Sequence, residues 1–540
     1  MTHREVLRAL SGLLMGMFVS ILAGTVVSTS LPLIIADLGG SQSSYTWVVT
    51  ATMLAMAVST PVWGKLADIF NRKLLIQLAL SIFVLGSAAA GFSHSTDFLI
   101  GARVVQGLGA GGLAALSQII LADIISPRER GRYAGLFGAV MAVGSVGGPL
   151  LGGVITDAIG WRWNFFVAMP VAIAALIMLQ LTLHLPKHDR AKPKIDYLGA
   201  VFITAGISML LIWVSLVDHN FAWSSVETAW MVGGSILLLV LAVVTELRVA
   251  NPLVPLTMFR NRTFTLTVIA SLAVGVLMFG TAVFLAQYMQ LARGATPTES
   301  GLLTIPMMLG LFTASTVFGQ VITRTGRWKP VMVSGAVTAI VGSAMLGRLD
   351  GDSPMWFVSL AMLILGAGLG MLMQNLVLVV QNSIAVENLG VATSAVTFFR
   401  TIGGTAGVSV LGSILALRVK DLIADGLATL DPEQQAQAAQ ALGSGSVPKI
   451  ADLPPAVADI VEHSYGSAIG HVFLLTVPLA IVALIAIALL PKQDLGRLTA
   501  VQARAQAEEV AADMAGVGAP SSVGEGRTDD DEAAPATMRS

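Results

Sequence analysis

The charged side chains best placed for chemistry lie in one short stretch that follows an apolar run. The chain reads Gly64-Lys-Leu-Ala-Asp68-Ile-Phe-Asn-Arg72-Lys73 there, so an acid stands four residues before the first of two bases. Such an acid pairs with Arg72, or with a base on another helix such as Arg132, and it can hold two helices together in one state and release them in another. A positively charged loop that only obeys membrane topology is the alternative. We predict a latch whose members are Gly64, Asp68, Arg72, Lys73, Asp123 and Arg132.

Two arginines lie inside apolar runs, where an unpaired charge is costly. Arg103 lies near one end of its run, with Gln106 one helical turn away, and Arg400 lies near the middle of another run. A side chain near the end can extend to the membrane surface, whereas one at the middle needs a partner or a water-filled cavity. We predict that Arg103, Gln106 and Arg400 transfer protons or line a central cavity. Snorkelling of Arg103 and a buried pairing of Arg400 are the alternatives.

One apolar run is rich in small residues at helical spacing. Small residues four positions apart let two helices approach closely, and a Gly-Pro pair bends a helix. This pattern predicts a bent helix that packs closely against a neighbouring helix, with ordinary helix packing as the alternative. The run contains Gly135, Gly144, Gly148, Pro149, Gly152 and Gly153.

Uncharged polar residues inside the apolar runs are candidates for contacts to a transported molecule in a central cavity. Each is equally consistent with a hydrogen bond between two helices. The cavity candidates are Thr25, Ser28, Gln287, Tyr288, Gln374 and Asn375.

The elements that position these residues are predicted to be membrane-spanning helices. The chain has 540 residues, of which 55% are apolar and only 12% are charged, and this composition is too hydrophobic for a soluble protein. A helix needs about 20 apolar residues to cross a hydrocarbon core of about 30 Å. Runs of this length predict an all-α integral membrane protein with fourteen spans. They lie near residues 12–36, 46–67, 74–93, 98–122, 133–156, 164–184, 197–216, 229–247, 264–290, 300–322, 330–347, 355–380, 392–416 and 468–490.

The order of the spans predicts two six-helix bundles with two inserted central helices. The stretch Gly64–Arg72 recurs as Gly319–Arg327 with the same Gly-to-Arg spacing, although Thr323 takes the place of the acid. Duplicated halves are common in transporters. We expect an amino-terminal bundle at 1–190, the inserted pair at 191–262, a carboxy-terminal bundle at 263–492 with a long external loop at 418–467, and a disordered cytoplasmic tail at 493–540.

Lysine and arginine gather in alternate connections between the spans, as in the stretches 128–132 and 187–194. Because these residues favour the cytoplasmic side, we predict a multi-pass protein of the cytoplasmic membrane with both termini in the cytoplasm. The lipid bilayer is its expected surrounding, and a net charge of −1 argues against binding to nucleic acid.

Several kinds of chemistry lack the residues that they require. The sequence has no cysteine, and its Gly64-Lys65 pair is followed by leucine, so the phosphate-binding loop of ATP-driven proteins is missing. We expect no cofactor, no metal site and no catalytic residues, and we expect an ion gradient or the substrate itself to drive transport. The alternatives from another class are a membrane-embedded enzyme and a non-transporting receptor.

These residues resemble the major facilitator superfamily, and specifically its fourteen-span drug:proton antiporters of the multidrug efflux type. Gly64 to Lys73 is similar to the family's loop motif between spans two and three. Arg103 to Gly111 is similar to its span-four motif, to which a part in proton transfer is attributed. Gly135 to Gly153 is similar to its span-five antiporter motif.

The resemblance implies a secondary active transporter that exports small amphipathic compounds or drugs by proton antiport with alternating access. One position departs from the family, because Ala23 stands where members often have a protonatable aspartate. No carboxylate lies in the middle of any span, so a neutral or weakly charged, largely apolar small molecule fits best as substrate. An exporter of an endogenous lipid, siderophore or secondary metabolite is the runner-up.

Overall fold

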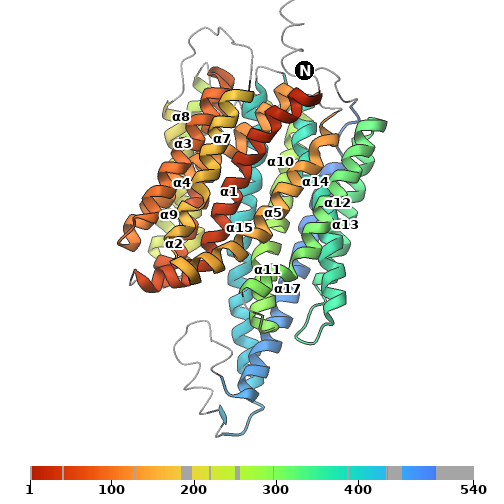
Figure 1. Cartoon of the computed structure of the whole chain (residues 1–540). Coiled ribbons are helices and arrows are strands. Elements are labelled where there is room, and N and C mark those ends of the chain that lie inside the picture. Colours follow the sequence, from red (N-terminus) through yellow and green to blue (C-terminus); the bar gives the residue numbers. More distant parts are fainter. Residues whose placement is uncertain are drawn as a thin grey trace, which may run out of the picture.

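The fold is built from long apolar helices that pack side by side (Figure 1). The coordinates are a computed structural model of the chain. They describe residues 3–38, 42–126, 129–183, 197–217, 221–249, 256–295, 297–385, 388–432, 434–435, 453–493 and 495.

The amino-terminal bundle packs around α4, which contacts α2 and α3, while α1 contacts α5 and α7. Ala79, Leu80, Leu116 and Ile119 form part of its fully buried apolar core. Asn71 begins α3 by accepting a hydrogen bond from the amide of Lys73, as expected for an N-cap residue. The helices of this bundle are α1 (His3–Asp37), α2 (Gln42–Ile69), α3 (Arg72–Gly91), α4 (Thr96–Ile124), α5 (Arg130–Ile159), α6 (Trp163–Phe166) and α7 (Ala168–Thr182).

The carboxy-terminal bundle packs α12 and α13 against α14, and α10 against α15 and α17. A short 3-10 helix, η1 (Leu256–Arg260), precedes it, and α10 continues into one turn of π-helix, η2 (Tyr288–Ala292). Its helices are α10 (Arg262–Gln287), α11 (Pro297–Leu303), α12 (Ile305–Thr325), α13 (Trp328–Leu346), α14 (Met355–Ser383), α15 (Leu389–Leu427) and α17 (Pro455–Ala488).

The inserted pair consists of α8 (Tyr197–Leu216) and α9 (Val226–Arg248). Ile207 of α8 is buried against Val58 of α2 and Phe398 of α15, so α8 covers the line where the two bundles meet. On α9, side chains such as Leu237 are exposed on the outer surface. The pair is therefore central in the sequence but peripheral in space.

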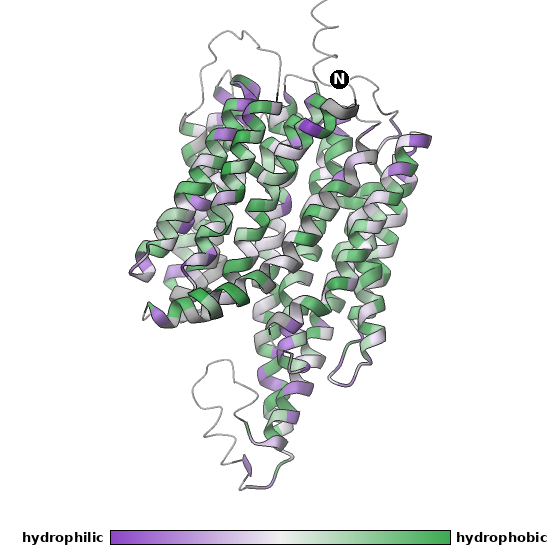
Figure 2. Ribbon diagram, in the orientation of Figure 1, coloured by the Kyte–Doolittle hydropathy of each residue, from purple (hydrophilic) through white to green (hydrophobic). Residues whose placement is uncertain are grey.

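The predicted fold class is confirmed. Each of the fourteen predicted spans coincides with a helix or a pair of consecutive helices, and no predicted end extends more than two residues beyond them. Among the described residues, 11 helices are long and apolar enough to cross a membrane. The other three predicted spans lie in α2, α5 and α8. Hydrophobic residues cover the flanks of the helices, and hydrophilic residues gather toward their ends (Figure 2). This distribution is the one that a lipid surrounding requires.

Two helices are longer than the sequence predicted. The structure shows helix at 418–427 and 455–467, where an external loop was expected, so that α15 and α17 continue beyond the other helices (Figure 1). Val457 and Val461 are buried in a cluster that includes Ile423 and Leu427. The two extensions stabilise one another through this apolar contact, which hydropathy alone did not reveal because the segments are also rich in charge.

Candidate functional site

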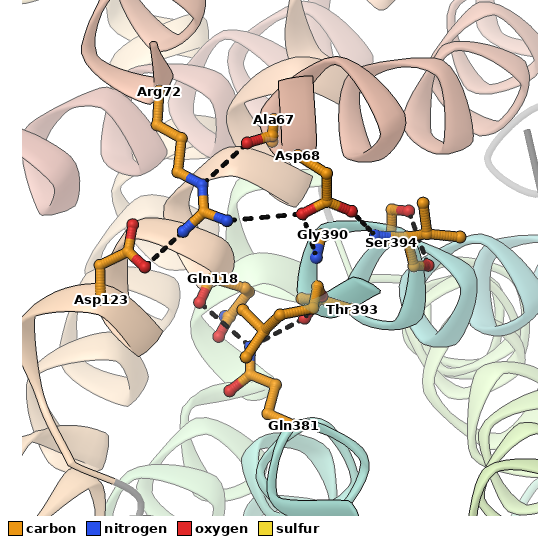
Figure 3. A network of polar contacts seen from close by, with 11 residues as sticks. Ala67, Asp68, Arg72, Gln118, Asp123, Gln381, Gly390, Thr393 and Ser394 are labelled. Atoms are coloured by element: carbon orange, nitrogen blue, oxygen red, sulfur yellow. Dashed lines mark hydrogen bonds and ion pairs between the residues drawn. The ribbon is translucent and has the colours of Figure 1, made fainter. Parts of the chain in front are cut away.

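The candidate site lies where the two bundles meet, at the face of the molecule from which α1 begins. We call this the amino-terminal face. Helices α2 and α4 end there, and α15 begins there. Polar groups of both bundles converge at this point, as Figure 3 shows for Asp68, Arg72 and Asp123 with Gly390.

Asp68 of α2 binds the start of α15 in the other bundle. Its two carboxylate oxygens accept hydrogen bonds from the backbone N–H groups of Gly390 and Val391, at 2.9 and 3.0 Å. The first N–H groups of a helix have no partner within the helix and carry a partial positive charge. Asn388, which precedes α15, gives no side-chain cap. Asp68 therefore caps α15 from the opposite bundle.

Arg72 holds Asp68 in place and joins it to α4. Its guanidinium forms ion pairs with Asp68, at 3.4 Å, and with Asp123, and its Nε donates to the carbonyl of Ala67 at 2.9 Å. Asp68, Arg72 and Asp123 are only 7%, 5% and 5% exposed. Two carboxylates of this cluster face one guanidinium, and one of them, Asp68, also accepts from the N-terminus of α15.

The backbones of α2 and α15 touch at two glycines. A Cβ atom on Gly390 would lie 2.6 Å from the Oδ1 atom of Asp68, and one on Gly64 would lie 2.9 Å from the carbonyl oxygen of Gly390 and would overlap Ser394. Any larger residue at either position would separate the helices. The glycines thus allow the contact that the Asp68 carboxylate then fixes.

A second polar contact closes the same face. Gln381 of α14 donates through its Nε2 to the carbonyl of Gln118 on α4, at 3.2 Å, and to Thr393 on α15, at 2.9 Å. Because Gln118 belongs to the amino-terminal bundle, this amide joins the bundles beside the Asp68 contact. We call the whole set of contacts the gate.

Two predicted latch members stand apart from the gate contacts. The Lys73 ammonium donates to the carbonyl of Gln180 on α7, at 2.7 Å, and so stays within its own bundle. Arg132 lies in the first turn of α5, and its side chain is outside the described residues.

Arg103 and Gln106 form a buried polar chain inside the amino-terminal bundle. Arg103 donates to the Gln106 side-chain oxygen and, at 3.5 Å, to the carbonyl of Val48 on α2. Gln106 donates to Ser87 on α3 at 2.7 Å. All the partners that we find for Arg103 among the described residues are uncharged, so it remains a buried cation between three helices.

The glycine-rich helix α5 packs closely against α1. A Cβ atom on Gly144 would lie 2.8 Å from Ile21, one on Gly148 would lie 2.6 Å from Thr25, and one on Gly152 would lie 2.6 Å from the carbonyl of Val26. Thr25 donates to the Gly144 carbonyl at 3.0 Å, so this cavity candidate joins two helices. Gly135, Pro149 and Gly153 also lie in α5.

Some of the remaining cavity candidates form hydrogen bonds within the protein, and for the others no hydrogen bond is described. Tyr288 is fully buried and donates to the Asp350 carbonyl at 2.9 Å, and Asn375 donates to the Met371 carbonyl of its own helix at 2.6 Å. The buried Gln287 Oε1 lacks a hydrogen-bond partner among the described residues. Gln374 is partly exposed, and the side chain of Ser28 is not described.

Sequence reasoning missed the residues of the second bundle that complete the gate. Gly390 and Val391 contribute only backbone N–H groups, which have no signature in residue type. Gln381 and Gln118 had a usable signal, because an amide side chain inside an apolar helix needs a partner.

Two helical bundles that meet at one closed face through a small set of breakable contacts define a membrane transporter rather than an enzyme. The chain belongs to the Major Facilitator Superfamily, because the model of that family matches residues 13–408. Two solved transporter structures resemble this chain at 14% and 13% identity, and at that level they show the fold alone. The proton:xylose symporter XylE is 13% identical, with a TM-score of 0.57 over 94% of this chain and 100% of that one.

Relatives in sequence are transporters as well. The MFS-type transporter Rv1877 of Mycobacterium tuberculosis (strain ATCC 25618 / H37Rv) is 36% identical over 88% of this chain and 68% of its own length. The multidrug transporter protein MdtP of Bacillus subtilis (strain 168) is 34% identical over 77% of each chain.

Proposed function

We propose that this transporter is a secondary active exporter of small amphipathic compounds, driven by proton antiport with alternating access. The observation that carries the proposal is the gate, in which the Asp68 carboxylate of one bundle caps helix α15 of the other. The similarity to MdtP, whose name describes a multidrug transporter, supports amphipathic compounds as the substrate class.

The gate gives alternating access a physical basis. In our proposal the amino-terminal face is cytoplasmic, as the lysine and arginine distribution predicts. With the gate closed, a molecule held between the bundles has no exit toward the cytoplasm. Opening the gate breaks the two Asp68 hydrogen bonds and exposes the start of α15, and closing restores them. The two bundles then rock about the substrate.

Buried carboxylates at the gate link its closure to protons. A protonated Asp68 has lost the negative charge that favours the helix N-terminus, so protonation weakens the closed state. Asp123 competes for the same arginine, because Arg72 pairs with both acids. A proton gradient across the membrane can therefore bias the gate without any acid in the middle of the membrane.

The test is transport by the purified full chain in everted liposomes. The probes are Hoechst 33342, dansyl-labelled undecanoate and the uncharged methylamide of the latter. We expect uptake of at least one probe only under an imposed pH gradient. Asp68→Asn is expected to lower the rate roughly tenfold or more, because it removes charge-assisted hydrogen bonds.

Two results would contradict this proposal. Transport at the same rate with and without the gradient would remove proton antiport, and no transport of any of the three probes by a folded protein would remove amphipathic export. Arg418→Gln is the control, because Arg418 is exposed on the extension of α15 and far along the helix from the gate. It is expected to behave as the unaltered protein.

A further inference from the structure

Arg400 is placed near the middle of the membrane. It lies eleven residues after Leu389, the first residue of α15, which corresponds to roughly 16 Å along the helix. The hydrocarbon core is about 30 Å thick, so Arg400 is about halfway across. An ionisable residue at this depth normally faces the protein interior and has a partner or a ligand.

No described residue of the protein neutralises Arg400. Its side chain is partly exposed, and it forms no hydrogen bond or ion pair with any described residue. The sequence has no carboxylate in the middle of any predicted span. Arg103 differs, because it is buried and donates to Gln106 and to the Val48 carbonyl.

The backbone fixes where Arg400 stands. A Cβ atom on Gly275 of α10 would overlap the carbonyl oxygen of Arg400 and would lie 3.0 Å from the amide of Gly404. One turn further, a Cβ atom on Gly403 would lie 2.8 Å from Leu272. Because α10 and α15 are in backbone contact here, α15 cannot rotate to move the guanidinium away. The cation is built into the bundle at this depth.

A second polar side chain stands at the same depth on a neighbouring helix. Gln374 lies nine residues before Ser383, the end of α14 at the amino-terminal face, which is roughly 14 Å along the helix. It too is partly exposed and has no hydrogen bond to a described residue. Helices α14 and α15 are in contact. Both side chains therefore lie at a similar depth on helices that contact one another, and both carry N–H donors.

We propose that Arg400 binds the anionic group of the transported molecule, with Gln374 as a second donor, so that the preferred substrates are amphiphiles with one carboxylate, sulfonate or phosphate-ester group. This inference rests on the proposed export function and narrows its substrate class. A guanidinium offers a planar fork of N–H donors that matches such oxyanions. A cationic drug would meet only repulsion at this position.

The test compares two probes that differ by one charge. They are dansyl-labelled undecanoate and its uncharged methylamide, titrated by dansyl fluorescence against the full chain in nanodiscs of zwitterionic lipid. We expect the unaltered protein to bind the anion at least tenfold more tightly. Arg400→Gln should lower anion affinity by about ten- to hundredfold and leave the methylamide within about twofold. Arg400→Lys should recover part of the loss, and Gln374→Leu should weaken only the anion.

The control is Arg418→Gln, which makes the same change at an exposed position of the same helix. Equal loss of both probes in Arg400→Gln, or an unaltered protein without preference for the anion, would overturn the inference. If Arg400→Gln does not fold, the affinities of the unaltered protein and of Arg400→Lys for the anionic probe, relative to the methylamide, still test the inference. If the pH gradient drives transport of the neutral probe or of Hoechst 33342, but the protein binds the anionic probe no more tightly than the neutral one, the anion site is contradicted and the export function is not. Absence of all transport removes the export function.

Discussion

The two copies of the repeated turn differ in what their side chains do. After α2, Asp68 and Arg72 are buried, and Asp68 reaches the backbone of α15 in the other bundle. After α12, Thr323 donates to the Gly319 carbonyl of its own helix at 3.0 Å. Arg327 is exposed there and forms no ion pair with a described residue. The acid of the first copy joins the two bundles, whereas the hydrogen bond described for Thr323 in the second copy stays within its own helix.

The difference indicates that the acid, and not the turn itself, joins the two bundles. Both copies keep the glycine and the arginine at the same spacing, and α12 ends in a left-handed glycine, Gly326, with φ of 71°. Only the first copy has a carboxylate to meet a helix N-terminus. The contact between α2 and α15 therefore depends on a charged side chain. In the second copy, α12 packs against α5, but its turn has no acid at the corresponding position.

The largest expected effect concerns the arginines of the two copies. Arg72→Ala leaves Asp68 and Asp123 buried without their cation, and removing one partner of a buried ion pair destabilises a protein by about 3–5 kcal/mol. Arg327→Ala removes an exposed side chain, for which we expect a change within about 0.5 kcal/mol. Thermal unfolding of both variants in the same detergent measures the contrast. Equal losses would show that the two copies contribute alike.

A smaller effect is expected from a substitution at the gate that leaves every charge in place. Gly390→Ala inserts a methyl group about where the Asp68 carboxylate lies, so we expect it to open the gate. Gly412→Ala is the matched control on the same helix, because nothing lies within 4 Å of the added Cβ. The chain has no cysteine, so spin labels attach only to Leu74→Cys and Arg324→Cys, two exposed sites at the amino-terminal face.

Double electron–electron resonance between these labels reports the gate directly. We expect Gly390→Ala to move the population toward longer distances by roughly tenfold relative to Gly412→Ala, a shift of about 1.4 kcal/mol. A distance distribution that is the same in both variants would mean that the approach of α2 and α15 does not control the gate.

The sequence predicted the spans and one side of the gate, for a physical reason. Hydropathy follows directly from the lipid solvent, and the Asp68–Arg72 pair is a local contact between residues four apart. The partner of Asp68 is a pair of backbone N–H groups more than three hundred residues away, at Gly390 and Val391, and a backbone group has no residue signature. Charge pattern alone also did not separate Lys73, which stays within its bundle, from the gate residues.

The smallest effect concerns an aspartate whose surroundings contrast with those of Asp68. Asp37 ends α1 at the opposite face and is largely exposed. It accepts a hydrogen bond from Trp161 at 2.9 Å and pairs with Arg162 at 3.3 Å, both in its own bundle. These contacts, the Trp161 hydrogen bond first, lower the pKa of Asp37 below its ordinary value of 3.8.

A lowered pKa fixes the sign of the pH dependence. The stabilisation by Asp37 is fully present above pH 3.8 and is lost as the pH falls through the lower pKa of the folded protein. We expect Asp37→Asn to unfold at a slightly lower temperature than the unaltered protein at neutral pH. We expect this difference in unfolding temperature to disappear in acid. Melting both proteins from neutral pH down to about pH 3 tests this. A gap that is absent at neutral pH, or that widens in acid, would show that exposure to solvent cancels the contact. The effect is small because water screens the exposed pair, whereas the buried acids of the gate have no such screening.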